Sequence, residues 1–161
     1  MTTQATLTVP SAYPVYKFVA PSINNSQERV YFSLNLNDPV ASSGFVFAGI
    51  AFLAFPSPDE NLVPVYQFTI PSPSDQNPLR FYYSPNSSPS AGWVLSTTAN
   101  NKSGIAFYTP ASTVQGTVPV YNFHYVFGAL SLWNNRYQLS PNAAEPWTAS
   151  NPAIGFYALP L

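Results

Sequence analysis

Apolar and polar residues alternate in a five-residue pattern that the chain repeats three times. Pro-Val-Tyr-x-Phe occurs at residues 14–18, 64–68 and 119–123, and its variable position is polar each time. Because successive side chains of a strand point to opposite faces, the pattern predicts a β-strand whose tyrosine and phenylalanine face the core. A repeat spaced by about fifty residues predicts a repeated structural unit. The polar occupants are Lys17, Gln67 and Asn122.

A second strand pattern closes each repeat. It reads GIAFLAFP at 49–56, GIAFYTP at 104–110 and AIGFYALP at 153–160. An isoleucine and a phenylalanine stand two residues apart in each copy, which predicts that they share one strand face. These pairs are Ile50 and Phe52, Ile105 and Phe107, and Ile154 and Phe156. The small residue between them indicates close packing at that point, and it is Ala51, Ala106 or Gly155.

Two more blocks lie between these strands. Arg-x-x-x-Ser-x-Asn occurs at 29–35, 80–86 and 136–142, which predicts that three of the five basic residues share one repeat position. Its Ser-x-Asn end predicts a turn, because these side chains bond to nearby backbone. An aromatic residue follows the turn in each copy, namely Phe45, Trp93 and Trp147.

Each repeat therefore contains four short strand candidates, and no segment has a sustained apolar period of 3.6 residues. Three such lobes predict an all-β fold with twelve strands, a β-trefoil, in a single domain over residues 1–161. The lobes are expected at about 7–60, 61–115 and 116–161. The first and fourth strands would form a barrel and the second and third would form capping hairpins. Closure about a three-fold axis removes exposed sheet edges.

Charge is the unusual feature of the composition. Charged residues are 7% of the chain and the formal net charge is −1, whereas charged residues are roughly 25% of typical proteins. There is no basic stripe for nucleic acid and no apolar run for membrane insertion. The absence of cysteine excludes disulfides and thiolate metal sites. The first ten residues lack the features of a secretory signal, so we expect a cytoplasmic location.

The order of the four blocks resembles two known groups of sequences. One is a repeat of secreted bacterial proteins that often accompanies hydrolase domains. The other is the mushroom lectin-like β-trefoil family, to which the mushroom tyrosinase light subunit and a mushroom mannose-binding protein belong. The resemblance covers about residues 7–161. It implies a β-trefoil that binds mannose-type sugars or associates with another protein without catalysis. The Gln-x-Trp signature of ricin-type trefoils is absent, so their sugar site is not transferred.

The residues themselves do not favour an enzyme. His124 is the only histidine, and the equivalent positions of the other repeats hold Val19 and Thr69. General-base catalysis needs an oriented partner as well as a suitable pKa, and no motif supplies one. No carboxylate recurs in all three repeats, so nothing pairs two of them for glycoside hydrolysis. We therefore expect no catalytic residue, no metal and no cofactor.

The repeated arginine, asparagine and aromatic residues have two interpretations. They are structural if each arginine spans a hairpin and each asparagine closes a turn. They form up to three shallow sites for neutral glycans if guanidinium and amide groups bind hydroxyls beside an aromatic face. The candidate sugar-binding residues are Arg29, Asn35, Phe45, Arg80, Asn86, Trp93, Arg136, Asn142 and Trp147.

The segment HYVFGALSLW at 124–133 is apolar, whereas the equivalent segments at 19–28 and 69–78 are polar loops. Exposed apolar patches often mark interaction sites. The segment is thus either a partner interface, for a second copy or a host protein, or part of the core. The interface candidates are Tyr125, Phe127, Leu130 and Trp133.

A lectin-like protein is the interpretation that the sequence favours. Its expected partners are glycans or glycoproteins, and a homo-oligomer or an enzyme partner is an open alternative. The first alternative function is an accessory subunit or interaction protein that docks on an enzyme without binding sugar. The second is a protease inhibitor that uses the loop PSPSDQNP at 71–78.

Overall fold

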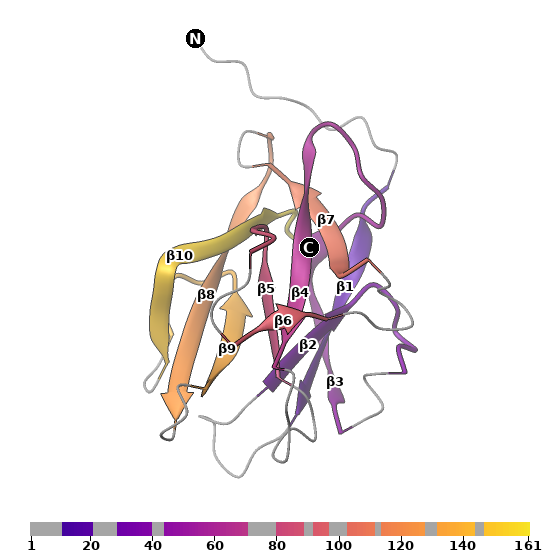
Figure 1. Ribbon diagram of the computed structural model, residues 1–161. Helices are drawn as coiled ribbons and strands as arrows, with labels where there is room; N and C mark the ends of the chain where they lie inside the picture. Colours follow the sequence, from indigo (N-terminus) through magenta and orange to yellow (C-terminus); the bar gives the residue numbers. More distant parts are fainter. Residues whose placement is uncertain are drawn as a thin grey trace.

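A computed structural model of the chain describes residues 11–20, 29–39, 44–70, 80–88, 92–96, 103–111, 114–127, 132–143 and 147–161. These residues form ten β-strands and no helix, so the fold is all-β (Figure 1). No helix in these ranges has the length and apolar character needed to cross a membrane.

The strands form three antiparallel groups, each centred on one copy of the Pro-Val-Tyr-x-Phe strand. In the first sheet, β1 (Tyr13–Ala20) lies between β2 (Arg29–Ser33) and β3 (Val46–Ala54). In the second, β4 (Leu62–Thr69) pairs with β5 (Phe81–Ser84), β6 (Val94–Leu95) and β7 (Ile105–Pro110). In the third, β8 (Val118–Phe127) lies between β9 (Leu132–Gln138) and β10 (Thr148–Ala158).

The third strand of each lobe differs from the prediction. It was expected to form a capping hairpin with the second strand, but it pairs with the central strand of its own sheet. In the first and third lobes it continues without a break into the fourth strand, which gives the long strands β3 and β10. The described residues therefore contain ten strands instead of twelve.

A register shift occurs at the same place in all three sheets. Phe52 faces Val15 and Ile50 faces Tyr16, so Ala51 is the extra residue of a bulge. The same shift occurs at Ala106 and at Gly155 in the other two sheets. A bulge reverses the faces that side chains occupy along a strand.

This shift corrects the prediction that each isoleucine and phenylalanine share a face. Phe52 is 2% exposed, whereas Ile50 is 43% exposed. It also corrects the expected orientation of the central strands. Their valines are buried, and the tyrosines that follow are only half-buried. The valines are Val15, Val65 and Val120, and the tyrosines are Tyr16, Tyr66 and Tyr121.

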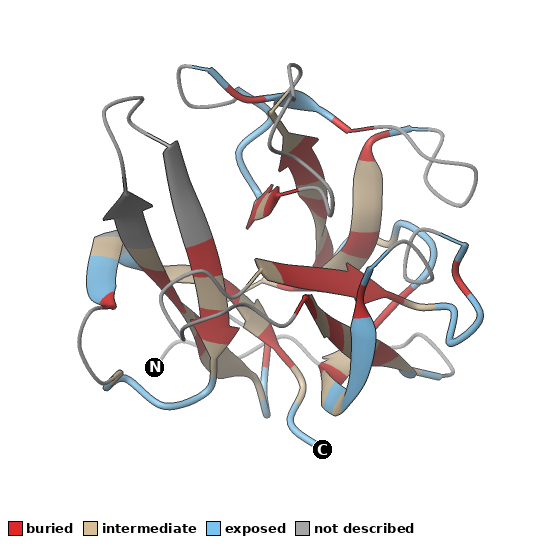
Figure 2. Cartoon of the chain, turned by 90° about the horizontal axis from the view of Figure 1, so that it is seen from below, coloured by how far each residue is buried: buried red, intermediate tan, exposed pale blue. Residues whose placement is uncertain are grey.

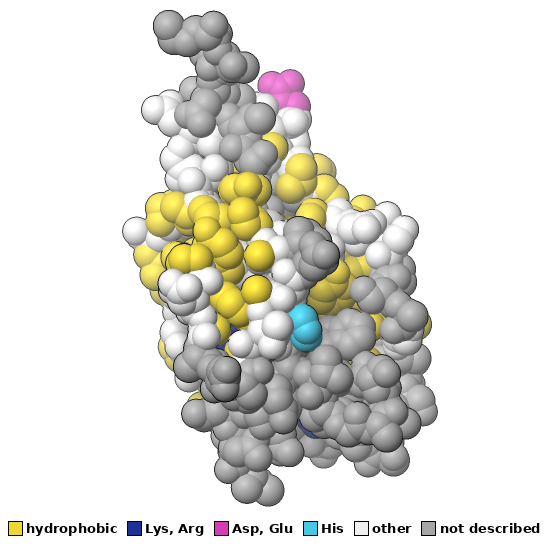
Figure 3. Space-filling model, turned by 90° about the vertical axis from the view of Figure 1, so that its left-hand side faces the viewer, with side chains coloured by type: hydrophobic (Ala, Val, Ile, Leu, Met, Phe, Trp, Pro, Cys, Tyr) yellow, Lys and Arg dark blue, Asp and Glu magenta, His cyan; other side chains and the backbone are white. Residues whose placement is uncertain are grey.

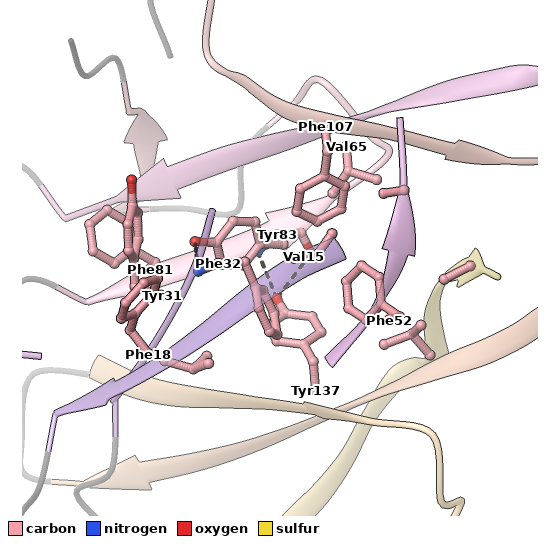
Figure 4. Packing of buried hydrophobic residues seen from close by; sticks show 14 of the residues in the cluster. Val15, Phe18, Tyr31, Phe32, Phe52, Val65, Phe81, Tyr83, Phe107 and Tyr137 are labelled. Carbon is pink, nitrogen blue, oxygen red and sulfur yellow. Dashed lines mark hydrogen bonds between the residues drawn. The ribbon is translucent and has the colours of Figure 1, made fainter. Parts of the chain in front are cut away.

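Buried residues lie along many of the strands (Figure 2). The core consists of layers to which each sheet contributes one residue, and Figure 4 shows part of it. Phe32, Tyr83 and Tyr137 form one triangle of rings, with centroids 5.1, 5.7 and 5.7 Å apart. A second triangle, with centroids 5.5 to 5.8 Å apart, consists of Phe52, Phe107 and Phe156. The buried valines of the central strands form a third set of three.

Short backbone bridges join the sheets at their ends. Phe55 and Tyr108 exchange hydrogen bonds of 2.9 and 2.8 Å, which join the first sheet to the second. Leu53 and Leu159 do the same between the first sheet and the third. The equivalent residue at the junction of the second and third sheets is Pro110, which has no N–H to donate.

Candidate functional site

The strand registers show that the three arginines do not share one repeat position. The phenylalanine that ends the Pro-Val-Tyr-x-Phe motif faces a tyrosine in the first two lobes and an arginine in the third. These facing residues are Tyr31, Tyr82 and Arg136. The prediction that aligned Arg136 with Arg29 and Arg80 was therefore wrong by two residues. Two extra residues, Gln138 and Leu139, precede the turn serine of the third lobe and caused the misalignment.

In the corrected alignment, the aromatic residue that follows each turn contacts the residue at one and the same repeat position. Phe45 lies 5.8 Å from Tyr31 and Trp93 lies 5.7 Å from Tyr82, measured between ring centroids. In the third lobe the guanidinium carbon of Arg136 lies 4.4 Å from the ring centroid of Trp147. All three aromatic side chains are buried. Their contacts favour the structural interpretation of Phe45, Trp93 and Trp147, and their role in sugar binding stays a prediction.

The remaining repeated residues lie in turns and in the interior. The Asn35 N–H donates to Ser33 Oγ at 3.0 Å, and Asn35 Oδ1 accepts from the Asn37 N–H at 3.0 Å. Asn86 makes the equivalent pair of bonds, and the Asn142 N–H donates to Ser140 Oγ at 3.4 Å. The Ser-x-Asn turns are thus confirmed. Arg29 is half-buried and Arg80 is 2% exposed, so Arg80 offers little surface to a ligand.

A pocket of about 590 Å³ lies where the first sheet meets the second. It is formed by β2 and the turn after it, by β7 and by a glutamine of β4. Of the predicted sugar-binding residues it includes only Asn35. Its lining residues are Tyr31, Phe32, Ser33, Leu34, Asn35, Asp38, Pro56, Gln67, Ser103, Ile105, Ala106, Phe107 and Tyr108.

A buried carboxylate lies on one side of this pocket. Asp38 is 3% exposed, and its Oδ2 accepts hydrogen bonds from Tyr31 Oη at 2.6 Å and Ser33 Oγ at 2.7 Å. Charge-assisted bonds of this kind are stronger than neutral ones and fix the carboxylate in one orientation. The Asp38 carboxylate therefore provides a rigid hydrogen-bond acceptor at the pocket wall.

A buried amide lies on another side and connects the pocket to the core. The Gln67 Oε1 accepts from Tyr83 Oη at 3.1 Å, and the Gln67 amide donates to Ser96 Oγ at 3.3 Å. The Phe32 N–H donates to Tyr83 Oη at 2.9 Å. Tyr137 Oη accepts from the Tyr83 N–H at 2.7 Å and donates to the Tyr83 carbonyl at 3.0 Å. Burial raises the pKa of both tyrosines well above the usual value of about 10.

A second pocket, of about 390 Å³, lies where the second sheet meets the third. Six of its eight described lining residues stand at positions equivalent to residues of the first pocket, but its chemistry differs. Pro85, Ala111, Gly155 and Tyr157 replace Leu34, Pro56, Ala106 and Tyr108, and Ile154 and Phe156 replace Ile105 and Phe107. Its lining residues are Val63, Pro85, Pro110, Ala111, Ile154, Gly155, Phe156 and Tyr157.

Sequence reasoning missed most of the first pocket. Asp38, Gln67 and Ser103 come from three separate segments, and none of them recurs in all three lobes. A search for repeated polar residues could not have found them. The missed signal was the carboxylate three residues after the Ser-x-Asn turn of the first lobe.

The other candidate residues lie elsewhere. His124 Nδ1 is 3.1 Å from Ser150 Oγ, in a bond that ties β8 to β10. Among the described residues, no three histidine, cysteine or acidic side chains gather as a metal site would require.

The segment 124–133 was expected to be a loop, but residues 124–127 and 132–133 extend the β8–β9 hairpin. Leu130 lies outside the described residues, and the side chains of Tyr125, Phe127 and Trp133 are not described, so the interface role stays a prediction.

Comparison of the chain with protein-family models, with curated proteins and with solved structures finds no match in any of the three.

Proposed function

We propose that the protein is a non-catalytic, lectin-like β-trefoil protein that binds neutral glycans of the mannose type. Three sheets with the same central strand, the same bulge and shared core layers support the trefoil assignment. The sequence resemblance supports the mannose preference, and the pocket between the first two sheets supports sugar binding.

The observation that carries this proposal is the mixture of polar and aromatic groups around the 590 Å³ pocket. A pyranose ring presents hydroxyl groups at its edge and an apolar face. The exposed Asn35 amide and Ser103 hydroxyl are suited to the hydroxyls, and the half-buried ring of Tyr108 is suited to the apolar face. The buried Asp38 and Gln67 lie behind them in the pocket wall. A pocket of this volume is within the usual range for small ligands, about 300–1,000 Å³.

The charge of the pocket favours a neutral ligand. Asp38 is the only charged residue among the described residues that line the pocket. A second negative charge, as in a uronic acid or a sialic acid, would be repelled by the buried carboxylate. Neutral hexoses should therefore bind more tightly than their acidic counterparts.

A glycan array followed by calorimetry with mannose oligosaccharides tests the proposal. Ile105→Trp should fill the pocket and abolish binding, because Ile105 lines it and is only partly buried. Ile154→Trp is the matched control, since Ile154 holds the equivalent position in the other pocket and should leave glycan binding unchanged. The proposal fails if the wild type binds no neutral glycan or if both variants bind as the wild type does.

A docking function is the second candidate, and an exposed apolar strand end favours it. Val46 and Phe47 are exposed at the start of β3, beside the half-buried Tyr16. Phe47→Ser should weaken association with a partner while leaving glycan binding intact. Light scattering of the wild type over a range of concentrations would show whether that partner is a second copy.

The loop at 71–78, the candidate for a protease inhibitor, lies outside the described residues.

A further inference from the structure

We propose that the pocket between the second and third sheets is a separate binding site for a small, uncharged aromatic molecule. The side of the molecule formed by β8 and β10 carries gathered apolar side chains and few charged ones (Figure 3). The pocket has a volume of about 390 Å³. Its walls include Val63, Pro85, Pro110, Ile154 and Tyr157.

The lining determines the chemical class of the ligand. The described residues of the lining include no charged side chain and no side-chain amide, and Tyr157 alone among them has a polar side-chain group. A ligand with several polar groups would therefore lose hydrogen bonds to water without replacing them, which costs roughly 1–3 kcal/mol for each group. An apolar cavity of about 150 Å³ stays dry and binds benzene. A pocket of 390 Å³ has room for a molecule with two fused rings.

The pocket occurs at the junction that lacks a backbone bridge. Phe55 pairs with Tyr108, and Leu159 pairs with Leu53, at the two other junctions. The equivalent residues here are Pro110 and Tyr157, and both of them line the pocket. Proline cannot donate the hydrogen bond that would draw the two strand ends together. Pro110 and Tyr157 therefore line the pocket without the backbone bond that joins the strand ends at the other two junctions.

The two pockets also differ at the bulge of the fourth strand. Gly155 stands where the first pocket has Ala106, and its nearest neighbours are Asn122 and Tyr137, 3.5 Å from an added Cβ. The two pockets therefore share their place in the fold but differ in chemistry. A glycan in one and an aromatic molecule in the other would not compete.

Indole is a suitable probe because it is uncharged, aromatic and has two fused rings. Its binding to the full-length protein would be measured by titration with ligand-observed NMR. We expect saturable binding to the wild type, binding weakened about tenfold or more by Ile154→Trp, and no change with Ile105→Trp. Because indole contains no sugar, the two binding measurements are independent. The protein can bind indole without binding glycans, and it can bind glycans without binding indole.

The melting temperature of each variant shows whether it is folded. If Ile154→Trp does not fold, Val63→Phe replaces it, because Val63 lines the same pocket from β4. The proposal is overturned if the wild type shows no saturable indole binding, if the folded pocket variant binds indole as the wild type does, or if Ile105→Trp removes indole binding equally.

Discussion

Tyr83 and Tyr137 lie at the centre of the molecule and bond to each other through backbone and hydroxyl groups. Neither hydroxyl can lose its proton there without placing a charge in an apolar interior. Phe32 holds the equivalent position in the first lobe and has no hydroxyl. The layer is therefore partly polar, and its hydrogen bonds align the second strands of the three lobes.

This layer predicts instability at high pH. Burial raises the pKa of both tyrosines, so the folded state holds their protons more tightly than the unfolded state does. Their contribution to stability is complete below about pH 10 and is lost as pH rises above that value. Each tyrosine should lower the free energy of unfolding by about 1.4 kcal/mol per pH unit in that range.

Urea unfolding between pH 8 and pH 11.5 would measure this loss. Tyr137→Phe should cost about 1–3 kcal/mol at pH 8, because it leaves the buried Tyr83 N–H without its acceptor. The same variant should reduce the alkaline loss, since one of the two buried protons is gone. An identical pH dependence in the variant and the wild type would contradict the assignment.

Among the elements, the bulge of the fourth strand decides which side chains enter the core. The small residue at the bulge was visible in the sequence, but its effect on strand faces was not. Without the bulge, Ile50 and Phe52 would point the same way, and the periodicity predicted just that. A bulge inserts one residue without a sequence signature strong enough to locate it.

The bulge residue of the third lobe can be tested directly. Gly155→Ala should stabilise the protein by about 0.4–1 kcal/mol, because the unfolded chain loses freedom and an added Cβ meets neighbours only at ordinary contact distance. Gly49→Ala is the control in the first lobe. Gly49 has a φ of 111° and open space around it, so that change should destabilise by roughly 1–3 kcal/mol through backbone strain alone.

Thermal unfolding of the two variants would measure both effects. If Gly155→Ala is destabilising, the backbone at Gly155 differs from the backbone at Ala51 and Ala106, which accept a Cβ at the equivalent bulge position.

The sequence predicted the all-β fold, the three central strands and the Ser-x-Asn turns, because each depends on local chemistry repeated three times. It misplaced Arg136, because two inserted residues shift the third lobe while leaving its turn motif intact. It also missed the first pocket. Asp38 and Gln67 meet there only because two sheets pack together, and no pattern along the chain records that contact.

For the molecule as a whole, no lobe has a core of its own. Each ring layer takes one residue from each lobe, and the second lobe supplies Val65, Phe81, Tyr83 and Phe107 to the shared cluster. A fragment of residues 61–115 would expose those side chains on one side of a single sheet. Repeat units that cannot bury their apolar face alone are unstable in isolation.

We therefore expect no folded monomer of the 61–115 fragment. Three copies could rebuild the layers with identical residues, because Tyr83 and Phe107 stand at positions equivalent to those of the other lobes. Circular dichroism over a range of concentrations, combined with light scattering, would separate an unfolded chain from a folded trimer. A folded monomer with a cooperative melting transition would contradict the shared core, since a single lobe would then need a way to bury Val65, Tyr83 and Phe107 by itself.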